Sequence, residues 1–338
     1  MGHARLSPSS ASRWMQCPGS IRECSGIVEE ASPYAAEGTA AHALLEYCLQ
    51  NSLAPESFIG QTFNDFEVTR EMADAVGVAH QYVADLYQSA IDCGGTFQMY
   101  PEVNVFPARL ERLDVDGTAD IVVVTDQMVE VIDYKHGAGV AVSPRGNRQL
   151  QIYGIGALDT LGLEGDKPLR TTIIQPRVNQ LDGPIHFCTY SPEQVDQFTE
   201  EIRVAAAATD DPNAPLVPGE EQCRFCRAKS TCTALADHSL KAAQVVFDDL
   251  TVATPAMIEE NSLRPVNQLT EEQVCMILDN EALIRNWLTA VTDHAKEEML
   301  KGRSYPGFKL VAGRKSRKWD LKDDSLEELL RSLKKKGS

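Results

Sequence analysis

Two short runs of valine and isoleucine constrain the fold of this 338-residue chain more than any other feature. They occupy residues 121–124 and 129–132, and their β-branched side chains predict two adjacent strands joined by a turn. An acidic residue stands at the edge of each run, Asp120 before the first and Asp133 after the second. A hairpin that is apolar in its middle therefore carries two carboxylates at one end.

Lys135 follows Asp133 by two positions, so both side chains should project from the same face of the second strand. Carboxylates can hold Mg²⁺ or Mn²⁺ against a phosphodiester, and a lysine can offset the charge that develops on the phosphorane. A strand end that dips into solvent also explains an Asp-x-Lys sequence. For this motif alone, the solvent explanation is the better one.

The composition is that of an ordinary globular protein, with 43% hydrophobic and 24% charged residues. No apolar run reaches the length of a membrane span, and the first residues lack the apolar centre of a signal peptide. We therefore expect a cytoplasmic protein with no membrane partner. Its nine cysteines should be free thiols or metal ligands rather than disulfides.

The net charge of −17 argues against a broad nucleic-acid surface. Residues 301–338 nevertheless carry a net charge of +7, which leaves −24 on the rest of the chain. An acidic body with a basic tail can bind DNA locally, although a solvated chain end accounts for the same tail.

The order of the expected elements predicts an α/β core, a mixed sheet flanked by helices with further helices around it. Residues 7–19 are expected to be turn-rich, and Ser191 is expected to cap a helix. The expected helices span residues 40–49, 71–91, 149–161, 192–208 and 271–300, and the expected strands span 97–106, 119–125, 128–134, 171–175 and 184–190.

Four further residues bear on the charged end of the hairpin. His42 lies on the first expected helix, and Glu102 lies on the strand that precedes the hairpin. Gln149 and Tyr153 are four residues apart, on one face of the next helix. Taken singly, each of these residues is explained by an ordinary place in a helix or strand.

Together and in this order, the residues resemble the RecB-type branch of the PD-(D/E)XK nuclease superfamily. That branch has a helical histidine, a Gly-x-x-Asp strand edge, Asp-x-Lys and Gln-x-x-x-Tyr. The resemblance covers about residues 40–190 and implies a restriction-endonuclease-like core. It also implies that His42, Asp120, Asp133 and the Tyr134 carbonyl bind Mg²⁺ or Mn²⁺, while Lys135 assists the attack.

The same resemblance assigns roles to the remaining motif residues. Glu102 would supply a further acid, because the family often has one on this strand. Gln149 and Tyr153 would contact DNA, and the basic residues Arg145 and Arg148 beside them are expected to do the same.

A second motif lies after the expected core, where Cys223, Cys226 and Cys232 have the spacing C-x2-C-x5-C. Three thiolates can bind a soft metal, but a tetrahedral site or a cubane cluster needs a fourth ligand. Cys17 is the best candidate for it, and Cys24 is the alternative. From the spacing alone, zinc is slightly favoured.

The resemblance favours iron instead. Several RecB-type nucleases carry an iron–sulfur staple with one cysteine before the nuclease core and three after it. A structural 4Fe–4S cluster held by Cys17 and the three later cysteines is thus implied, with zinc as the alternative. The other cysteines, at positions 48, 93, 188 and 275, are expected to be buried thiols.

The opening sequence SPSSASRWMQCPGS and the Arg-Lys-Trp at 317–319 also resemble a phage-encoded group known as domain of unknown function 2800. This resemblance implies a role in phage or prophage DNA replication or recombination, in the bacterial host cytoplasm. A single-strand DNA-binding or annealing protein is the expected partner.

These observations predict a metal-dependent DNA nuclease, and an exonuclease in preference to an endonuclease. The alternative is a non-catalytic DNA-binding or scaffold protein that keeps the fold and the cluster. Four segments are expected: an N-terminal segment at 1–39, a nuclease core at 40–210, a cysteine segment at 211–240 and a helical region with a basic tail at 241–338.

Overall fold

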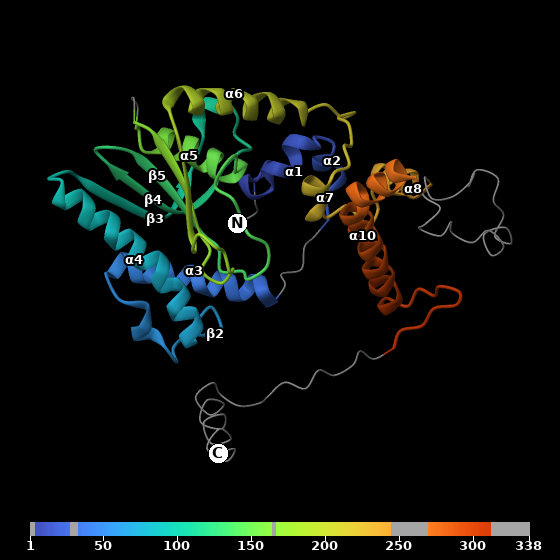
Figure 1. The fold of residues 1–338 in the computed structure, drawn as a ribbon, viewed down its shortest axis with the longest axis horizontal. Helices are drawn as coiled ribbons and strands as arrows, with labels where there is room; N and C mark the ends of the chain where they lie inside the picture. The colour runs from blue at the N-terminus through green and yellow to red at the C-terminus, as the bar shows by residue number, and fades with distance from the viewer. Residues whose placement is uncertain (1–3, 28–32, 164–166, 245–269, 312–338) are drawn as a thin grey trace, which may run out of the picture. The chain divides into compact units, whose positions relative to one another are not determined.

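The computed structural model describes residues 4–27, 33–163, 167–244 and 270–311 (Figure 1). The described residues up to Ala290 form one compact unit, and those from Val291 onward form a second. The expected segments 1–39, 40–210 and 211–240 all fall within the first unit. Most of the basic tail, including the Arg-Lys-Trp sequence, lies outside the described residues.

A five-stranded mixed sheet forms the centre of the first unit, in the order β3-β4-β5-β6-β7. Strands β5 and β6 are parallel, and the other neighbouring strands are antiparallel. A parallel pair requires a crossover, which contains helix α5. The predicted mixed α/β sheet is confirmed. Its strands are β3 (Phe97–Val105), β4 (Gly117–Thr125), β5 (Val129–Tyr134), β6 (Leu169–Ile174) and β7 (Ile185–Tyr190).

Helices cover both faces of this sheet (Figure 1). Successive residues of β4 point to opposite faces, so Ile121 and Val123 belong to one buried cluster while Val122 and Val124 belong to the other. The first cluster includes α3 and α4, and the second includes α5 and α6. These helices are α3 (Pro33–Asn51), α4 (Arg70–Asp92), α5 (Arg148–Thr160) and α6 (Pro192–Ala208).

Polar caps fix where three of these helices begin. The side chain of Thr69 accepts a hydrogen bond from the Met72 amide at the start of α4, and Asn147 caps α5 in the same way. Ser191 forms a capping box with Gln194 at the start of α6, which confirms the predicted cap.

The N-terminal segment packs against the connector that follows α6. The Gly19 amide donates a hydrogen bond to the Pro215 carbonyl at 3.0 Å. A Cβ atom at Gly19 would lie 2.5 Å from the Ala214 carbonyl oxygen, so only glycine fits there. Helix α1 (Ala11–Gln16) also contacts α7 (Glu220–Arg224). The two flanks of the core, far apart in sequence, therefore meet in space.

The remaining elements are short, apart from one long C-terminal helix. A two-stranded hairpin precedes α4, and the other helices lie at the N-terminus, in the loops and after α7. They are η1 (Pro8–Ser10), α2 (Ser20–Glu23), η2 (Pro55–Phe58), β1 (Thr62–Phe63), β2 (Phe66–Glu67), η3 (Ala108–Leu110), α8 (Thr233–Gln244) and α10 (Glu271–Leu300).

Two predictions need correction. Residues 7–19 include helix α1 as well as turns, because Trp14 is fully buried against the core and tertiary contacts order the segment. The thiols of Cys93 and Cys275 are exposed, since Cys93 follows the last turn of α4 and Cys275 lies near the start of α10. Cys48 is buried as predicted, and Cys188 is half-buried.

None of the helices in the described ranges has both the length and the apolar character needed to cross a membrane.

Candidate metal centre

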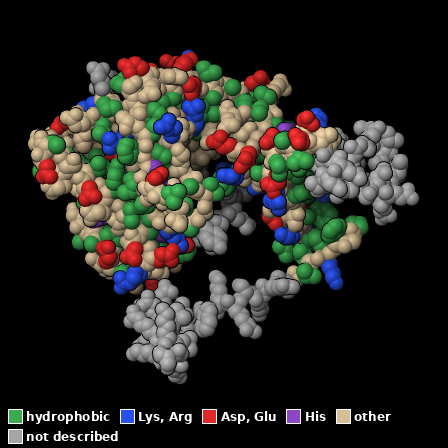
Figure 2. All heavy atoms as spheres, in the orientation of Figure 1, with side chains coloured by type: hydrophobic (Ala, Val, Ile, Leu, Met, Phe, Trp, Pro, Cys, Tyr) green, Lys and Arg blue, Asp and Glu red, His purple; other side chains and the backbone are tan. Residues whose placement is uncertain are grey.

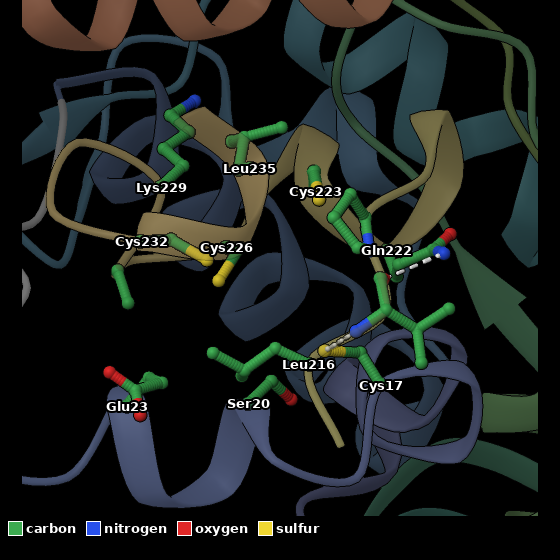
Figure 3. A pocket seen from close by; sticks show the side chains of 13 residues that line it. Cys17, Ser20, Glu23, Leu216, Gln222, Cys223, Cys226, Lys229, Cys232 and Leu235 are labelled. Carbon is green, nitrogen blue, oxygen red and sulfur yellow. Dashed lines mark hydrogen bonds between the residues drawn. The ribbon is translucent and has the colours of Figure 1, made fainter. Parts of the chain in front are cut away.

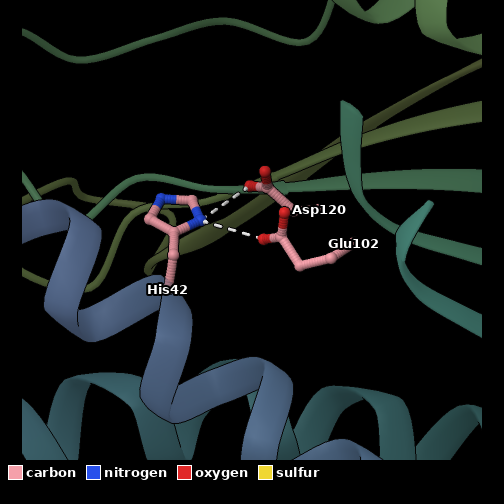
Figure 4. Close-up of side chains that lie close together, drawn as sticks. All are labelled: His42, Glu102 and Asp120. Atoms are coloured by element: carbon pink, nitrogen blue, oxygen red, sulfur yellow. Dashed lines mark ion pairs between the residues drawn. The ribbon is translucent and has the colours of Figure 1, made fainter. Parts of the chain in front are cut away.

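Three side chains that are distant in sequence converge at one edge of the sheet. His42 comes from α3, Glu102 from β3 and Asp120 from β4, and their ligand atoms all lie within 4.8 Å of one another (Figure 4). His42 Nδ1 is 3.5 Å from Asp120 Oδ2 and 3.9 Å from Glu102 Oε1. Figure 4 shows both carboxylates turned toward the imidazole, an arrangement that suits a bound cation.

The backbone of Glu102 is strained to make this approach. Its φ of 46° lies in the left-handed region, which a non-glycine residue in the middle of a strand rarely adopts. The β3–β4 ladder pairs Pro101 with Ile121 and Val103 with Ala119, and Glu102 and Asp120 face each other between these pairs. Backbone strain of this kind persists where the surrounding structure enforces it, often at functional sites.

Asp120 lies inside β4, as the expected strand at 119–125 implied, although β4 begins two residues earlier. Strand β4 begins at Gly117, because its backbone pairing with β3 continues beyond the apolar run. The Tyr134 amide donates a hydrogen bond to Asp120 Oδ2 at 2.8 Å, which ties the end of β5 to the trio. Asp120 is thus held by backbone groups of the sheet.

The electrostatics of the trio favour a cation. Burial raises the pKa of Glu102 to about 7, with the neighbouring Asp120 as the second cause. Burial also raises the pKa of Asp120 to about 8, assisted by Asp133. For His42, burial lowers the pKa and keeps the imidazole neutral, the form that binds metal. The two neighbouring carboxyl groups repel each other when both are ionised, and a divalent cation between them would stabilise the ionised pair.

Asp133 and Lys135 lie beside the trio but outside it. The two side chains were predicted to share a face, and they contact each other. Lys135 Nζ is 2.8 Å from Asp133 Oδ2 and donates a hydrogen bond to Oδ1 at 3.0 Å. Burial acts to lower the pKa of Lys135, but the carboxylates of Asp133 and Asp120 outweigh it and raise that pKa. Asp133 Oδ2 is buried, and the Lys135 ammonium is its ion-pair partner.

A polar network behind this site was not foreseen from the sequence. The hydroxyl of Tyr134 lies 2.8 Å from His136 Nδ1, and His136 Nε2 lies 3.3 Å from Glu37 Oε1. Arg177 forms an ion pair with the same Glu37 oxygen at 3.0 Å. Because Glu37 and His42 share helix α3, the network joins that helix to the end of β5. The histidine directly after Asp-x-Lys was its only sequence signal.

The predicted DNA-contacting residues have different surroundings. Gln149 Nε2 donates to the Tyr153 hydroxyl at 3.3 Å, so the expected pair on one face of α5 is formed. Tyr153 is buried, which leaves little of its ring for a ligand. Arg148 is paired with Glu201 at 2.9 Å, whereas Arg145 is exposed on the loop before α5.

The donor set fits a divalent cation. One imidazole and two carboxylates suit Mn²⁺, and the oxygen ligands suit Mg²⁺ as well. The buried Asp133 carboxylate, which is ion-paired with Lys135, places further oxygen lone pairs beside the trio. The structure thus brings together His42, Glu102 and Asp120, with Asp133 next to them.

The four predicted cluster cysteines line one cavity (Figure 3). The cavity measures about 20 Å³, which is room for about one water molecule. Within the described ranges, no three of its sulfur atoms lie within 4.8 Å of one another. Thiols suit zinc and iron alike, so the donors fit either metal. They are Cys17, Cys223, Cys226 and Cys232.

Cys24 lies close to the same group. Its sulfur is 3.7 Å from that of Cys226, and the hydrogen bond between the two side chains is the main cause that lowers the pKa of Cys24 to about 5. Cys17 instead accepts a hydrogen bond from the Val217 amide at 3.2 Å. Both candidates for the fourth ligand are therefore near the three later cysteines.

A protein-family model matches this chain. The family described as "Protein of unknown function (DUF2800)" matches residues 3–337, which is nearly the whole chain. The match includes the metal trio, the cysteine cavity and the C-terminal helix. The chain therefore belongs to the DUF2800 family.

Proposed function

We propose that this protein is a metal-dependent DNA nuclease, and an exonuclease in preference to an endonuclease. The convergence of His42, Glu102 and Asp120 within 4.8 Å, next to the Asp133–Lys135 pair, is the observation that carries the proposal. The mixed sheet flanked by helices is compatible with a PD-(D/E)XK core. The strained Glu102 backbone adds support, because an ordinary strand would not need it.

Each residue then has a physical task. His42, Glu102 and Asp120 would hold Mg²⁺ or Mn²⁺, which polarises a phosphodiester and lowers the pKa of the attacking water. Asp133 holds the Lys135 ammonium 2.8 Å from its own carboxylate, which fixes this cation beside the trio. Lys135 can then donate a hydrogen bond to a phosphate oxygen as negative charge develops there.

The cysteine cavity would have a structural role in this proposal. A 4Fe–4S cluster, or zinc, bound by Cys17 and the three later cysteines would link the N-terminal segment to the segment after the core. We further propose a setting in phage or prophage DNA recombination, in the bacterial cytoplasm, with a single-strand DNA-binding or annealing protein as partner.

The test is incubation of the purified protein with end-labelled linear DNA and closed circular DNA, with Mn²⁺ or with EDTA. We expect Mn²⁺-dependent shortening of linear DNA while circular DNA stays intact. Cleavage of both substrates would indicate an endonuclease. Binding of DNA without any product in Mn²⁺ would reject the nuclease and favour a scaffold protein.

A further inference from the structure

A second cavity lies on the loop side of β7, away from the cysteines. It measures about 500 Å³ and is formed by residues 141–145, in the loop before α5, and by residues from the β6–β7 loop and the start of β7. Gln175 holds the first loop in place, since its Oε1 accepts from the Val142 amide and its Nε2 donates to the Val140 carbonyl, both at 3.0 Å.

This cavity and the metal trio share one edge of the sheet. Strands β5 and β6 end at Tyr134 and Ile174, and the antiparallel β7 begins opposite them at Ile185. Asp120 on β4 is three strand spacings from β7 and Glu102 on β3 is four, which amounts to about 14–19 Å. At about 3.4 Å of helix axis per nucleotide, this distance corresponds to about four to six nucleotides of one strand.

The donors in the cavity suit an anion. The Arg145 guanidinium has no acidic partner among the described residues, and Gln180 Nε2 is buried with no acceptor in the same part of the chain. Asp182 also lines the cavity and opposes an anion, so a group with a single negative charge is favoured. His186 Nε2 lies 2.9 Å from the Gly183 carbonyl, which holds this ring against the β6–β7 loop.

Charge on the surface shown in Figure 2 is mixed, with acidic and basic side chains interspersed among the described residues. A strand of nucleic acid therefore needs local cationic contacts on a protein with a net charge of −17. Arg148 is a poor contact because it is already paired with Glu201. Arg145 faces no such competition in the described part of the chain.

We propose that this cavity binds a phosphodiester group of the DNA strand, about four to six nucleotides from the metal trio. Arg145 supplies the charge and Gln180 supplies a neutral hydrogen-bond donor. The inference rests on the proposed function, since it places one contact of the same substrate.

The experiment measures the affinity of a fluorescein-labelled oligothymidylate in EDTA over a range of salt concentrations. Arg145→Ala removes one phosphate contact, so the slope of log affinity against log salt should become shallower by about 0.7. At 0.1 M salt, this corresponds to a loss of about fivefold in affinity. Gln180→Leu should lower the affinity and leave the slope unchanged, because the lost donor is uncharged.

Lys167→Ala is the matched control, because it removes the same charge at the opposite end of β6. Lys167 Nζ donates to the Thr125 carbonyl at 2.8 Å, far along the strands from the shared edge. The control should keep the wild-type slope. Equal slopes for Arg145→Ala and Lys167→Ala, or no binding of DNA by the wild type, would overturn the inference.

The two proposals fail separately. Binding in EDTA requires no hydrolysis. If only Arg145→Ala has a shallower salt dependence and the wild type shows no Mn²⁺-dependent cleavage, the binding site in the cavity is supported and the nuclease is rejected. If the wild type cleaves DNA but Arg145→Ala and Lys167→Ala have the same salt dependence of binding, only the binding site in the cavity is rejected.

Discussion

At position 102, the variant with glycine should be more stable than the variant with alanine. Elsewhere on β3, the variant with alanine should be the more stable one. Both Glu102→Gly and Glu102→Ala remove the carboxylate and its repulsion with Asp120. The alanine variant keeps a Cβ atom at a φ of 46°, whereas glycine accepts this conformation without strain. The comparison therefore isolates the backbone strain from the charge.

The magnitude follows from two opposing terms. A non-glycine residue in the left-handed region costs about 1–2 kcal/mol, and the greater freedom of unfolded glycine costs about 0.5–1 kcal/mol. Glu102→Gly should therefore be more stable than Glu102→Ala by about 0.7 kcal/mol. Gln98 lies on the same strand with φ outside the left-handed region, so Gln98→Ala should be more stable than Gln98→Gly by a similar amount.

Urea unfolding of the four variants in EDTA measures both differences. The freedom of unfolded glycine cancels between the two positions, so the contrast between the pairs should equal the strain, about 1–2 kcal/mol. Alanine more stable than glycine at both positions would refute the strained conformation of Glu102. Neither position 102 variant should cleave DNA.

Three further predictions test the site and the cysteines. Lys135→Ala should lower the cleavage rate about 100-fold or more, because it removes a charge beside the phosphate. Its urea unfolding should stay cooperative, because no core contact is lost. Cleavage by Lys135→Ala at the wild-type rate would show that Lys135 has no part in the mechanism. In EDTA, stability should fall as pH rises from about 5 to 8, because the raised pKa values of Glu102 and Asp120 mean that the folded protein binds their protons more tightly than the unfolded chain. Glu102→Gln should weaken this pH dependence of the melting temperature, and Mn²⁺ should stabilise the wild type more at pH 8 than at pH 5; an identical pH profile for Glu102→Gln would contradict the raised pKa. Protein purified without oxygen should contain iron, which Cys17→Ser should lose and Cys24→Ser should keep, and Cys17→Ser should also unfold more easily. A colourless preparation with one equivalent of zinc would show that the site holds zinc and not an iron–sulfur cluster. Loss of metal only in Cys24→Ser would show that Cys24 is the fourth ligand.

Periodicity was enough to predict the core elements. The β-branched runs of β4 and β5 are buried on both faces of the sheet, so their composition indicated strands without ambiguity. The ends were less accurate, because backbone pairing continues where apolar side chains stop. The strand expected at 119–125 therefore begins two residues earlier, at Gly117.

Contacts between distant segments could not be predicted in detail from the sequence. The order of motifs suggested that His42 and Asp120 approach each other, but the left-handed backbone of Glu102 depends on the β3–β4 ladder and has no local signal. Glu37 and Arg177 meet His136 only because α3 and the β6–β7 loop converge on the end of β5. Such pairs become visible only in the folded chain.

The most direct test of the central claim measures Mn²⁺ binding and DNA cleavage on the same samples of wild type and Asp120→Asn. Isothermal titration would report the bound Mn²⁺, and end-labelled linear DNA would report cleavage. The wild type should bind Mn²⁺ and shorten the DNA, and Asp120→Asn should lose both while remaining folded. Cleavage by Asp120→Asn at the wild-type rate, or a wild type that binds no Mn²⁺ and leaves the DNA intact, would contradict the account.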